Sequence, residues 1–580
     1  MKRWKINEKA ALVLVTVAAA GLFGVLYANS LIPVEAPEGG AGGSRLETWE
    51  IADSDLNGAG LHEDKGIYEQ DSSIYDVYIS VFPTKDENGQ MLDLSAFALH
   101  TARDHSYNPV LNCNIQILKE GKKPDPLLDL DHKNATIRVR GNSSRGATYK
   151  SYKVKLEEEA GTFFGQKNLN INKHSSDVSK ISTKLQTDLL TQIDDIAGYR
   201  TYFMRLWIRD ASLPEEEQEF VYYGLYTETE QPNKTYLETR GLGSNAAMYK
   251  ASDFSFAMND VLLNVDDPAY SEEAFETVLA IREGSDHEKL LEMLAAVNDT
   301  TTDFAEIFGT YFDEDNYLTW LAFNILMGNE DITNHNYILY NPDNALTWYF
   351  IPWDFDGALR FGEHRSTFSQ PDSLRGIQML NVGILHRRYL RLEGSIGKLD
   401  DKMKELLANV MTKSRVNGLI DSYKPVLEKT MPFYPDIDLL DMEPDELFSY
   451  IDGIYSGILD NYEAFHKAAA YPSPMFVAAP ERLADGSLRF AWEASYSYQG
   501  RPITYDLRVY EDAGMQKLLF EQTKIAQTEY IMQRGLAEGT YYLQVTAEDD
   551  LGKEQLSLEH VQNTEQFVFG LLEFTVPAAP

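Results

Sequence analysis

Cysteine and basic residues are both scarce in this chain of 580 residues. Cys113 is the single cysteine, which excludes disulfides within the chain and zinc sites built on cysteine ligands. The 52 lysines and arginines are outnumbered by 90 aspartates and glutamates, which gives a net charge of −38. Because such a field repels phosphate backbones, a general role in binding nucleic acid is not expected.

Long apolar runs are also scarce, and the one that is present stands near the N-terminus. Residues Ala10 to Ala28 carry no charge and are about long enough to cross a bilayer. Four basic residues precede this run: Lys2, Arg3, Lys5 and Lys9. Since positive flanks stay in the cytoplasm, residues 1–9 are expected there, 10–29 as a transmembrane anchor, and the later residues outside a bacterial cell. A signal peptide cleaved near Ser30 is the alternative.

Three segments with different compositions follow the anchor. Residues 30–74 are rich in Gly, Pro and acidic side chains, which predicts a flexible stalk. Residues 75–470 mix strand-like alternation with helical patterns, so an α+β domain is expected. From 473 to 578, short alternating strands such as "SLRFAWEA" and "GTYYLQVTAEDDLG" are separated by Gly-rich turns. This pattern predicts an all-β, immunoglobulin-like sandwich and resembles a fibronectin type III domain.

The richest chemistry lies between Met327 and Leu359. A helix is expected to end near Gly328, and a polar loop with Asp331 and Asn336 follows. The strands "YILY" and "WYFIPW" then predict a hairpin, directly after which comes Asp354. The hairpin would bring these three side chains together as hard oxygen ligands, which suit magnesium or manganese. The alternative is that the loop residues simply cap turns.

The spacing within this stretch is that of a protein kinase. Protein kinases place a catalytic Asp five positions before a metal-binding Asn, and a hairpin then leads to a second metal-binding Asp. Asp331, Asn336 and Asp354 have this arrangement, although no His-Arg precedes the first Asp and "DFD" replaces "DFG".

Four blocks together resemble the spore coat protein H (CotH) kinase family. In chain order they are "IRVRGNSSRGATYKSYKVKL", "YYGLYTETEQPNKTYLETR", "YLTWLAFNILMGNEDITNHNYILY" and "WYFIPWDFDGAL". The resemblance implies a divergent, bilobal protein-kinase-like fold over about residues 75–470. It also implies transfer of phosphate from ATP to protein hydroxyls, with Mg²⁺ or Mn²⁺ and a spore coat or cell-surface protein as the acceptor.

The resemblance also assigns roles to single residues. Asp331 matches the catalytic Asp, Asn336 and Asp354 match the metal ligands, and Asp356 is a further metal ligand with a less defined part. The loop "RGNSS" takes the place of the loop that covers the phosphates. Its proposed nucleotide contacts are Gly141, Asn142, Ser143 and Ser144. An ordinary hairpin turn at Gly141 and Asn142 is the alternative.

A lysine that pairs with the phosphates is expected near this loop. Lys150 shares strand parity with the inward set Tyr152, Val154 and Leu156, and an inward lysine needs an anion, so it is preferred over Lys153. Glu230 matches a family glutamate that contacts the nucleotide or pairs with a lysine, and a solvent-facing role is the alternative.

The helix expected at residues 181–197 has lysines near its start, where the family usually has an arginine. Lys180 and Lys184 stand there, and because a lysine is a poorer bidentate partner, the family's ion pair is in doubt.

Three functions remain open from the sequence. The first is a membrane-anchored, extracytoplasmic protein kinase that acts on Ser or Thr. The second is a surface adhesin or scaffold that keeps the fold without turnover. The third is a metal-dependent phosphohydrolase that uses the same acidic cluster.

Overall fold

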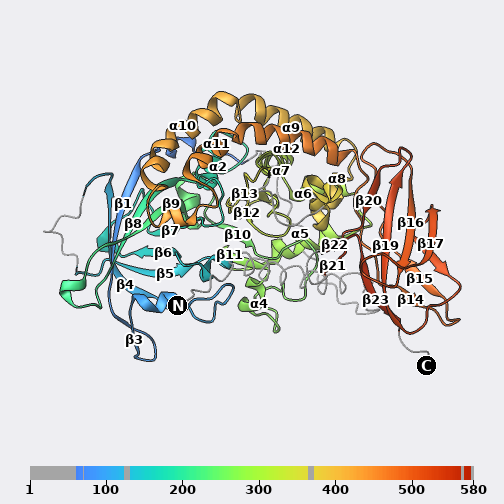
Figure 1. Ribbon diagram of the computed structural model, residues 1–580, viewed down its shortest axis with the longest axis horizontal. Helices are drawn as coiled ribbons and strands as arrows, with labels where there is room; N and C mark the ends of the chain where they lie inside the picture. The colour runs from blue at the N-terminus through green and yellow to red at the C-terminus, as the bar shows by residue number, and fades with distance from the viewer. Residues whose placement is uncertain (1–60, 69–70, 123–130, 363–370, 563–566, 577–580) are drawn as a thin grey trace.

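The computed structural model describes residues 61–68, 71–122, 131–362, 371–562 and 567–576. A β-barrel, a largely helical part and a pair of C-terminal sheets follow one another along the molecule (Figure 1). The predicted α+β class is therefore confirmed. Within the described ranges no helix has both the length and the apolar character needed to cross a membrane. The transmembrane segment predicted at 10–29 lies outside these ranges.

Seven strands close the barrel in the order β1-β4-β5-β6-β7-β9-β8. They are β1 (Ile74–Val81), β4 (Leu111–Lys119), β5 (Ala135–Arg140), β6 (Ser151–Leu156), β7 (Asn168–Asn172), β8 (Thr201–Asp210) and β9 (Val221–Glu230). Strand β1 runs parallel to β8, and the other neighbours are antiparallel. Alternate residues such as Val77, Ile79 and Val81 are buried in the barrel core, as their alternation predicts.

The segment Leu61–Tyr68 is folded onto the domain, although it falls inside the predicted stalk at 30–74. Leu61 is buried in the main core, and the Glu63 side chain has no exposed surface. Glu63 pairs with the guanidinium of Arg240, while Tyr68 donates its hydroxyl to Glu63 over 2.7 Å. This segment, which includes the short helix η1 (Lys65–Ile67), is called the N-terminal strap below.

Helices and a second sheet form the middle of the molecule. The sheet has the order β11-β10-β12-β13. Its strands are β10 (Ala246–Ala251), β11 (Leu279–Glu283), β12 (Tyr337–Pro342) and β13 (Tyr349–Pro352). The α-helices of this part are α2 (Ser182–Leu190), α3 (Lys234–Thr239), α4 (Glu272–Glu276), α5 (Glu288–Asn298), α6 (Phe304–Tyr311), α7 (Glu314–Met327), α8 (Ile384–Leu390), α9 (Ser395–Asn409), α10 (Lys413–Thr430), α11 (Pro444–Asp452) and α12 (Ile454–Ala469).

Short elements complete the connections. A small hairpin pairs β2 (Thr84–Lys85) with β3 (Met91–Leu92). The 3-10 helices are η2 (Leu94–Leu99), η3 (Ser143–Gly146), η4 (Glu158–Ala160), η5 (Glu215–Glu217), η7 (Asp372–Leu374), η8 (Gly376–Val382) and η9 (Asp436–Leu439).

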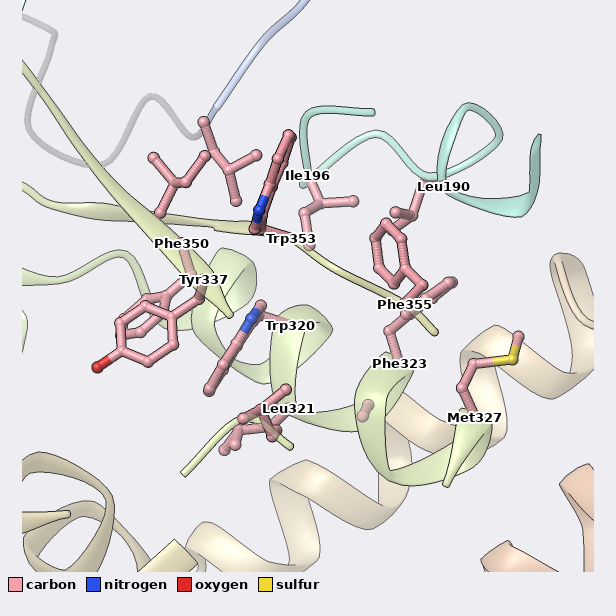
Figure 2. Packing of buried hydrophobic residues seen from close by; sticks show 14 of the residues in the cluster. Leu190, Ile196, Trp320, Leu321, Phe323, Met327, Tyr337, Phe350, Trp353 and Phe355 are labelled. Carbon is pink, nitrogen blue, oxygen red and sulfur yellow. The ribbon is translucent and has the colours of Figure 1, made fainter. Parts of the chain in front are cut away.

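Helix α7 is buried nearly all round, which explains why it can fix the loop that follows it. Trp320 packs on Tyr337 and Phe350 of the hairpin β12–β13 (Figure 2). Its buried residues include the apolar Leu318, Leu321 and Leu326, and Asn316 and Asn324 are buried too. Asn316 hydrogen-bonds the backbone of Phe350 in both directions, at 3.1 and 2.7 Å, and so ties the helix to the hairpin. The helix ends at Gly328, whose left-handed φ of 64° turns the chain into the polar loop.

The C-terminal part has two main sheets around a core of their own. One has the order β14-β15-β18, and the other β17-β16-β19-β20, with β23 on β19. The strands are β14 (Glu481–Arg482), β15 (Leu488–Ala491), β16 (Ile503–Tyr510), β17 (Leu518–Ile525), β18 (Glu529–Met532), β19 (Gly539–Asp549), β20 (Glu554–Leu556) and β23 (Leu572–Val576), with a separate pair, β21 (His560–Gln562) and β22 (Phe567–Phe569). Leu488, Phe490 and Trp492 alternate along the segment "SLRFAWEA" and are all buried in this core. The fibronectin type III likeness stays a prediction.

Candidate active site

The loop after α7 holds Asp331 between two side chains. Its Oδ1 lies 2.7 Å from Nε2 of His335, and its Oδ2 accepts a hydrogen bond from Nδ2 of Asn336 over 2.7 Å. Nδ1 of His335 lies 2.6 Å from Oδ1 of Asn334. Burial disfavours the charged imidazole, but the hydrogen bond to Asp331 and its charge outweigh burial, so the pKa of His335 is raised above its usual value. The imidazole therefore fixes the orientation of Asp331.

The hairpin β12–β13 forms in the predicted place and joins the loop to the "DFD" segment. Tyr337 is registered opposite Pro352, and the backbone N–H of Trp353 donates to the carbonyl of Asn336 over 3.2 Å. Asn336 and Asp354 both adopt left-handed backbone conformations, with φ values of 63° and 61°. Such conformations cost about 1–3 kcal/mol each in a residue other than glycine, and they cluster at functional sites.

Trp353 and Phe355 explain how Asp354 is held in that conformation. Both aromatic side chains point into the core, where Figure 2 shows Trp353 near Ile196 and Phe355 near Leu190. The carbonyl of Phe355 also accepts a 2.6 Å hydrogen bond from the hydroxyl of Ser182 at the start of α2. Anchored on both sides, Asp354 remains exposed.

Asp356 and Gly357 bring the same segment close to Asp331. Asp356 accepts a 3.0 Å hydrogen bond from the Ser176 hydroxyl. A Cβ on Gly357 would lie 3.3 Å from the Cβ of Asp331, so glycine permits this close approach. Burial, followed by the charge of Asp354, raises the pKa of Asp356 well above its usual range. Asp354 and Asp331 thus act on Asp356 as like charges.

This donor set fits a hydrated divalent cation with outside ligands better than a closed protein site. Among the described residues no three His, Cys, Asp or Glu side chains are arranged to hold a metal. Mg²⁺ is usually bound by one or two carboxylates, with waters and substrate phosphates completing its octahedron. Asp354 and Asp356, with the amide of Asn336, fit that kind of site, and the crowding of their charges is what a cation would relieve. Their roles as ligands stay predictions.

The loop "RGNSS" connects β5 to β6 and is braced from behind. Gly141 has a φ of 96°, and a Cβ there would lie 2.0 Å from the Ser144 hydroxyl oxygen. Gly141, Asn142 and Ser143 are exposed, and Ser144 is half-buried. Arg145 is buried and donates to the carbonyls of Asp104 and Tyr107 at 3.0 and 2.9 Å. The structure thus places an exposed turn here, and contact with phosphate stays a prediction.

Lys150 and Lys153 point to opposite sides of the barrel wall. Lys150 is buried, and its Nζ donates to the carbonyl of Arg145 over 2.6 Å. The inward direction predicted for Lys150 fits its burial, and contact of either lysine with phosphate stays a prediction. Inward residues of β6 such as Tyr152 and Val154 enter the barrel core. Lys153 is on the outer face, beside the registered residue Arg138, and is half-buried.

Glu230 is neither solvent-facing nor paired with a lysine. Its carboxylate is 2% exposed and forms ion pairs with Arg200 and Arg240. Lys184 instead pairs with Asp188 in its own helix at 2.6 Å, and Lys180 donates to the carbonyl of Ser175. Two arginines from outside α2 therefore hold the glutamate, and neither lysine does so. A role for Glu230 in nucleotide contact stays a prediction.

A set of cations lies near the acidic residues, and sequence reasoning found only one of them, Lys153. The others are Arg138 and Arg140 on β5, Lys250 on β10 and Arg282 on β11. Each is half-buried, and none forms a salt bridge within the described part of the chain. Asp354 is the main charge that supports the ionised form of Arg140 and of Lys250. The alternation Arg138–Val139–Arg140 was visible in the sequence, but Lys250 and Arg282 are brought in by sheet pairing alone.

A family model described as CotH kinase protein matches residues 137–438, more than half of the chain. Comparison with curated proteins gives no match. Among solved structures, the complex of the Shewanella oneidensis MR-1 toxin–antitoxin proteins HipA and HipB with operator DNA is similar at 10% identity and a TM-score of 0.22. That match covers 52% of this chain and 59% of the other.

Fold and family together define a kinase-like protein of mixed α and β structure. The chain belongs to the CotH kinase protein family.

Proposed function

We propose that this chain is an atypical protein kinase that transfers the terminal phosphate of ATP to Ser or Thr hydroxyls of a protein, using Mg²⁺ or Mn²⁺. The observation that carries the proposal is the clamped carboxylate of Asp331. It is fixed by His335 and Asn336 at 2.7 Å each, next to Asp354 and Asp356. A carboxylate so placed can orient a hydroxyl and accept its proton.

The chain's own residues would divide the work as follows. Asp354, Asp356 and Asn336 would hold the divalent cation, which when bound neutralises charge on the phosphates. Asp331 retains a free lone pair on each oxygen for the acceptor hydroxyl, because a carboxylate offers about four acceptor positions. His335 orients Asp331 through its contact with Oδ1.

The test compares Asp331→Asn with Asp354→Ala in the full chain. Asp331→Asn keeps the size of the side chain but removes the proton acceptor, so labelling from the terminal phosphate of ATP should fall by about a hundredfold or more. Binding of ATP with metal, followed as a rise in melting temperature, should persist in Asp331→Asn and disappear in Asp354→Ala.

Glu330→Gln is the matched control, because its exposed side chain lies beside Asp331. It should label like the wild type. Equal labelling of wild type and Asp331→Asn would contradict the assigned role. A wild type that binds metal–ATP but labels no acceptor would favour the scaffold alternative.

The setting of this activity is part of the same proposal. We propose that residues 10–29 anchor the chain in a bacterial membrane, that the described domains lie outside the cytoplasm, and that the acceptor is a spore coat or cell-surface protein. The C-terminal sheets would form a fibronectin type III-like module. Recovery of the intact chain in membranes, and its release by protease added outside intact cells, tests the topology.

A further inference from the structure

The loop that holds Asp331 contains no basic residue other than a histidine. Its six residues, Asp331 to Asn336, read "DITNHN". His335 is already engaged with Asp331 and Asn334. Transfer of a phosphoryl group nevertheless calls for cations close to the oxygens where negative charge lies. Under the proposed function, these cations have to come from another element.

Strand β10 is placed to supply one. Lys250 is registered opposite Ile338, two residues beyond Asn336 on β12. Ile338 is in turn registered opposite Ile351, three residues before Asp354 on β13. Directly opposed residues project from the same side of a sheet, so Lys250 projects from the same side as Ile338 and Ile351. It therefore stands near the start of β12 and the end of β13, the two strand ends next to Asn336 and Asp354. The charges of Asp354 and Asp331 both act on Lys250.

Strand β11 adds a second cation beside the first. Lys250 is registered opposite Ala280, and Arg282 lies at the irregularity where the pairing shifts between Met248 and Tyr249. Arg140 is the last residue of β5, and Lys153 lies on β6, the antiparallel neighbour of β5. Arg282 and Arg140 disfavour the charged form of both Lys250 and Lys153, so the four groups share one region.

This concentration of like charge is unfavourable in the protein alone. Burial, partly offset by the charge of Asp354, lowers the pKa of Lys250 to about 8. Neither Lys250 nor Arg282 forms a salt bridge within the described ranges, although the chain carries a surplus of acidic residues. A half-buried cation without a carboxylate partner is costly unless an anion reaches it. A group of four such cations fits a ligand that carries several negative charges at once.

We propose that β10 and β11 form a phosphate-binding element, in which Lys250 and Arg282 contact the triphosphate of the nucleotide from the side opposite Arg140 and Lys153. This inference rests on the proposed function and assigns residues to it. The two strands would supply the cations that the Asp331 loop lacks.

The test uses Lys250→Met and Arg282→Met in the full chain, with Lys517→Met as the control. Lys517 also loses one positive charge but is 70% exposed and lies in the C-terminal part. The probes are ATP with Mg²⁺, adenosine, and inorganic tripolyphosphate without metal, all measured by titration calorimetry. Each variant would lose a charge-assisted hydrogen bond to phosphate. The Kd for ATP and the Kd for tripolyphosphate should therefore rise about tenfold or more in each variant. Lys517→Met should match the wild type.

The melting temperature without ligand gives an independent readout. If Lys250 and Arg282 are held for a ligand, removing either relieves repulsion, and the variant should melt no lower than the wild type. A merely structural role predicts a lower melting temperature and unchanged affinity, and that result would overturn the inference.

Failure of the two proposals can be told apart. If the wild type binds ATP and both variants bind it equally well, the inference falls while the proposed function stands. If the wild type binds tripolyphosphate but not ATP, and Lys250→Met binds neither, the phosphate element stands and the kinase proposal falls. If the wild type binds neither compound, both are wrong.

Discussion

At the scale of single residues, the site is built from ordinary loop residues that are held by unusual partners. Asp331 and Asn336 are common in turns, and turn capping could account for either one. What separates this loop from a turn is the His335 clamp and the paired left-handed conformations at Asn336 and Asp354. Strain at these two positions is retained only where the surroundings enforce it.

His386 gives a prediction about acid sensitivity. It is fully buried against Trp320, Tyr317 and Phe350, and burial lowers its pKa to about 3. The unfolded chain binds a proton near pH 6.5, so this residue's contribution to stability is present above that pH and is lost as pH falls towards 3. The loss should reach about 2 kcal/mol at pH 5.

His386→Phe should remove that share of the acid sensitivity. Urea unfolding at pH 7.5 and at pH 5 measures it, as the difference between wild type and variant in the change of unfolding free energy. His62→Phe is the control, because His62 is exposed. A variant that loses as much stability as the wild type on acidification would contradict the assignment to His386.

At the scale of elements, the N-terminal strap belongs to the kinase-like domain. Glu63 and Tyr68 complete a buried network around Arg240, which also holds Glu230 at the end of β9. The backbone N–H of Asp64 donates to the carbonyl of Arg240 over 2.8 Å. The composition of residues 30–74, rich in Gly and acidic residues, gave no sign that the strap is folded. Its partners lie more than 130 residues away in the chain.

Glu63→Ala should therefore destabilise the domain. Removal of one partner leaves a buried guanidinium with less compensation, which costs about 3 kcal/mol or more. His62→Ala, next in sequence and exposed, should cost little. Chemical unfolding of the two full-length variants measures the difference. Equal stability would show that the strap is merely laid on the surface.

At the scale of the whole molecule, the C-terminal sheets are fastened to the helical part by polar contacts. Arg387 on α8 lies 3.6 Å from Glu493 and stacks over Phe476. The hydroxyl of Tyr498 accepts a 3.1 Å hydrogen bond from Asn381 in η8. These contacts hold the two parts together near the chain connection at residues 470–473.

Arg387→Ala should loosen this junction without unfolding either part. Thermolysin should cleave near residues 470–473 faster than in the wild type, since the contacts of Arg387 with Glu493 and Phe476 would be lost. Arg489→Ala is the control, because Arg489 is exposed and contacts only the C-terminal sheets. An unchanged cleavage rate would mean that the other contacts suffice.

The sequence by itself predicted the class of the fold, the hairpin that joins Asn336 to Asp354, and the family. These features are local, since strand alternation and loop spacing are set by residues close together in the chain. The partner of the inward Lys150 side chain, the carbonyl of Arg145, could not be predicted in this way. Whether an inward side chain meets a nucleotide or a barrel core depends on closure of the sheet, which pairs β1 with β8 across more than a hundred residues.

The tertiary structure alone decided which charges meet. The arginine pair on Glu230, the strap on Arg240 and the cations Lys250 and Arg282 all come from segments whose patterns carry no sign of their partners. The physical reason is that an ion pair leaves no periodicity in the sequence. Its partners are chosen by the packing that desolvates them, and that packing exists only once the barrel, the second sheet and the helices have come together.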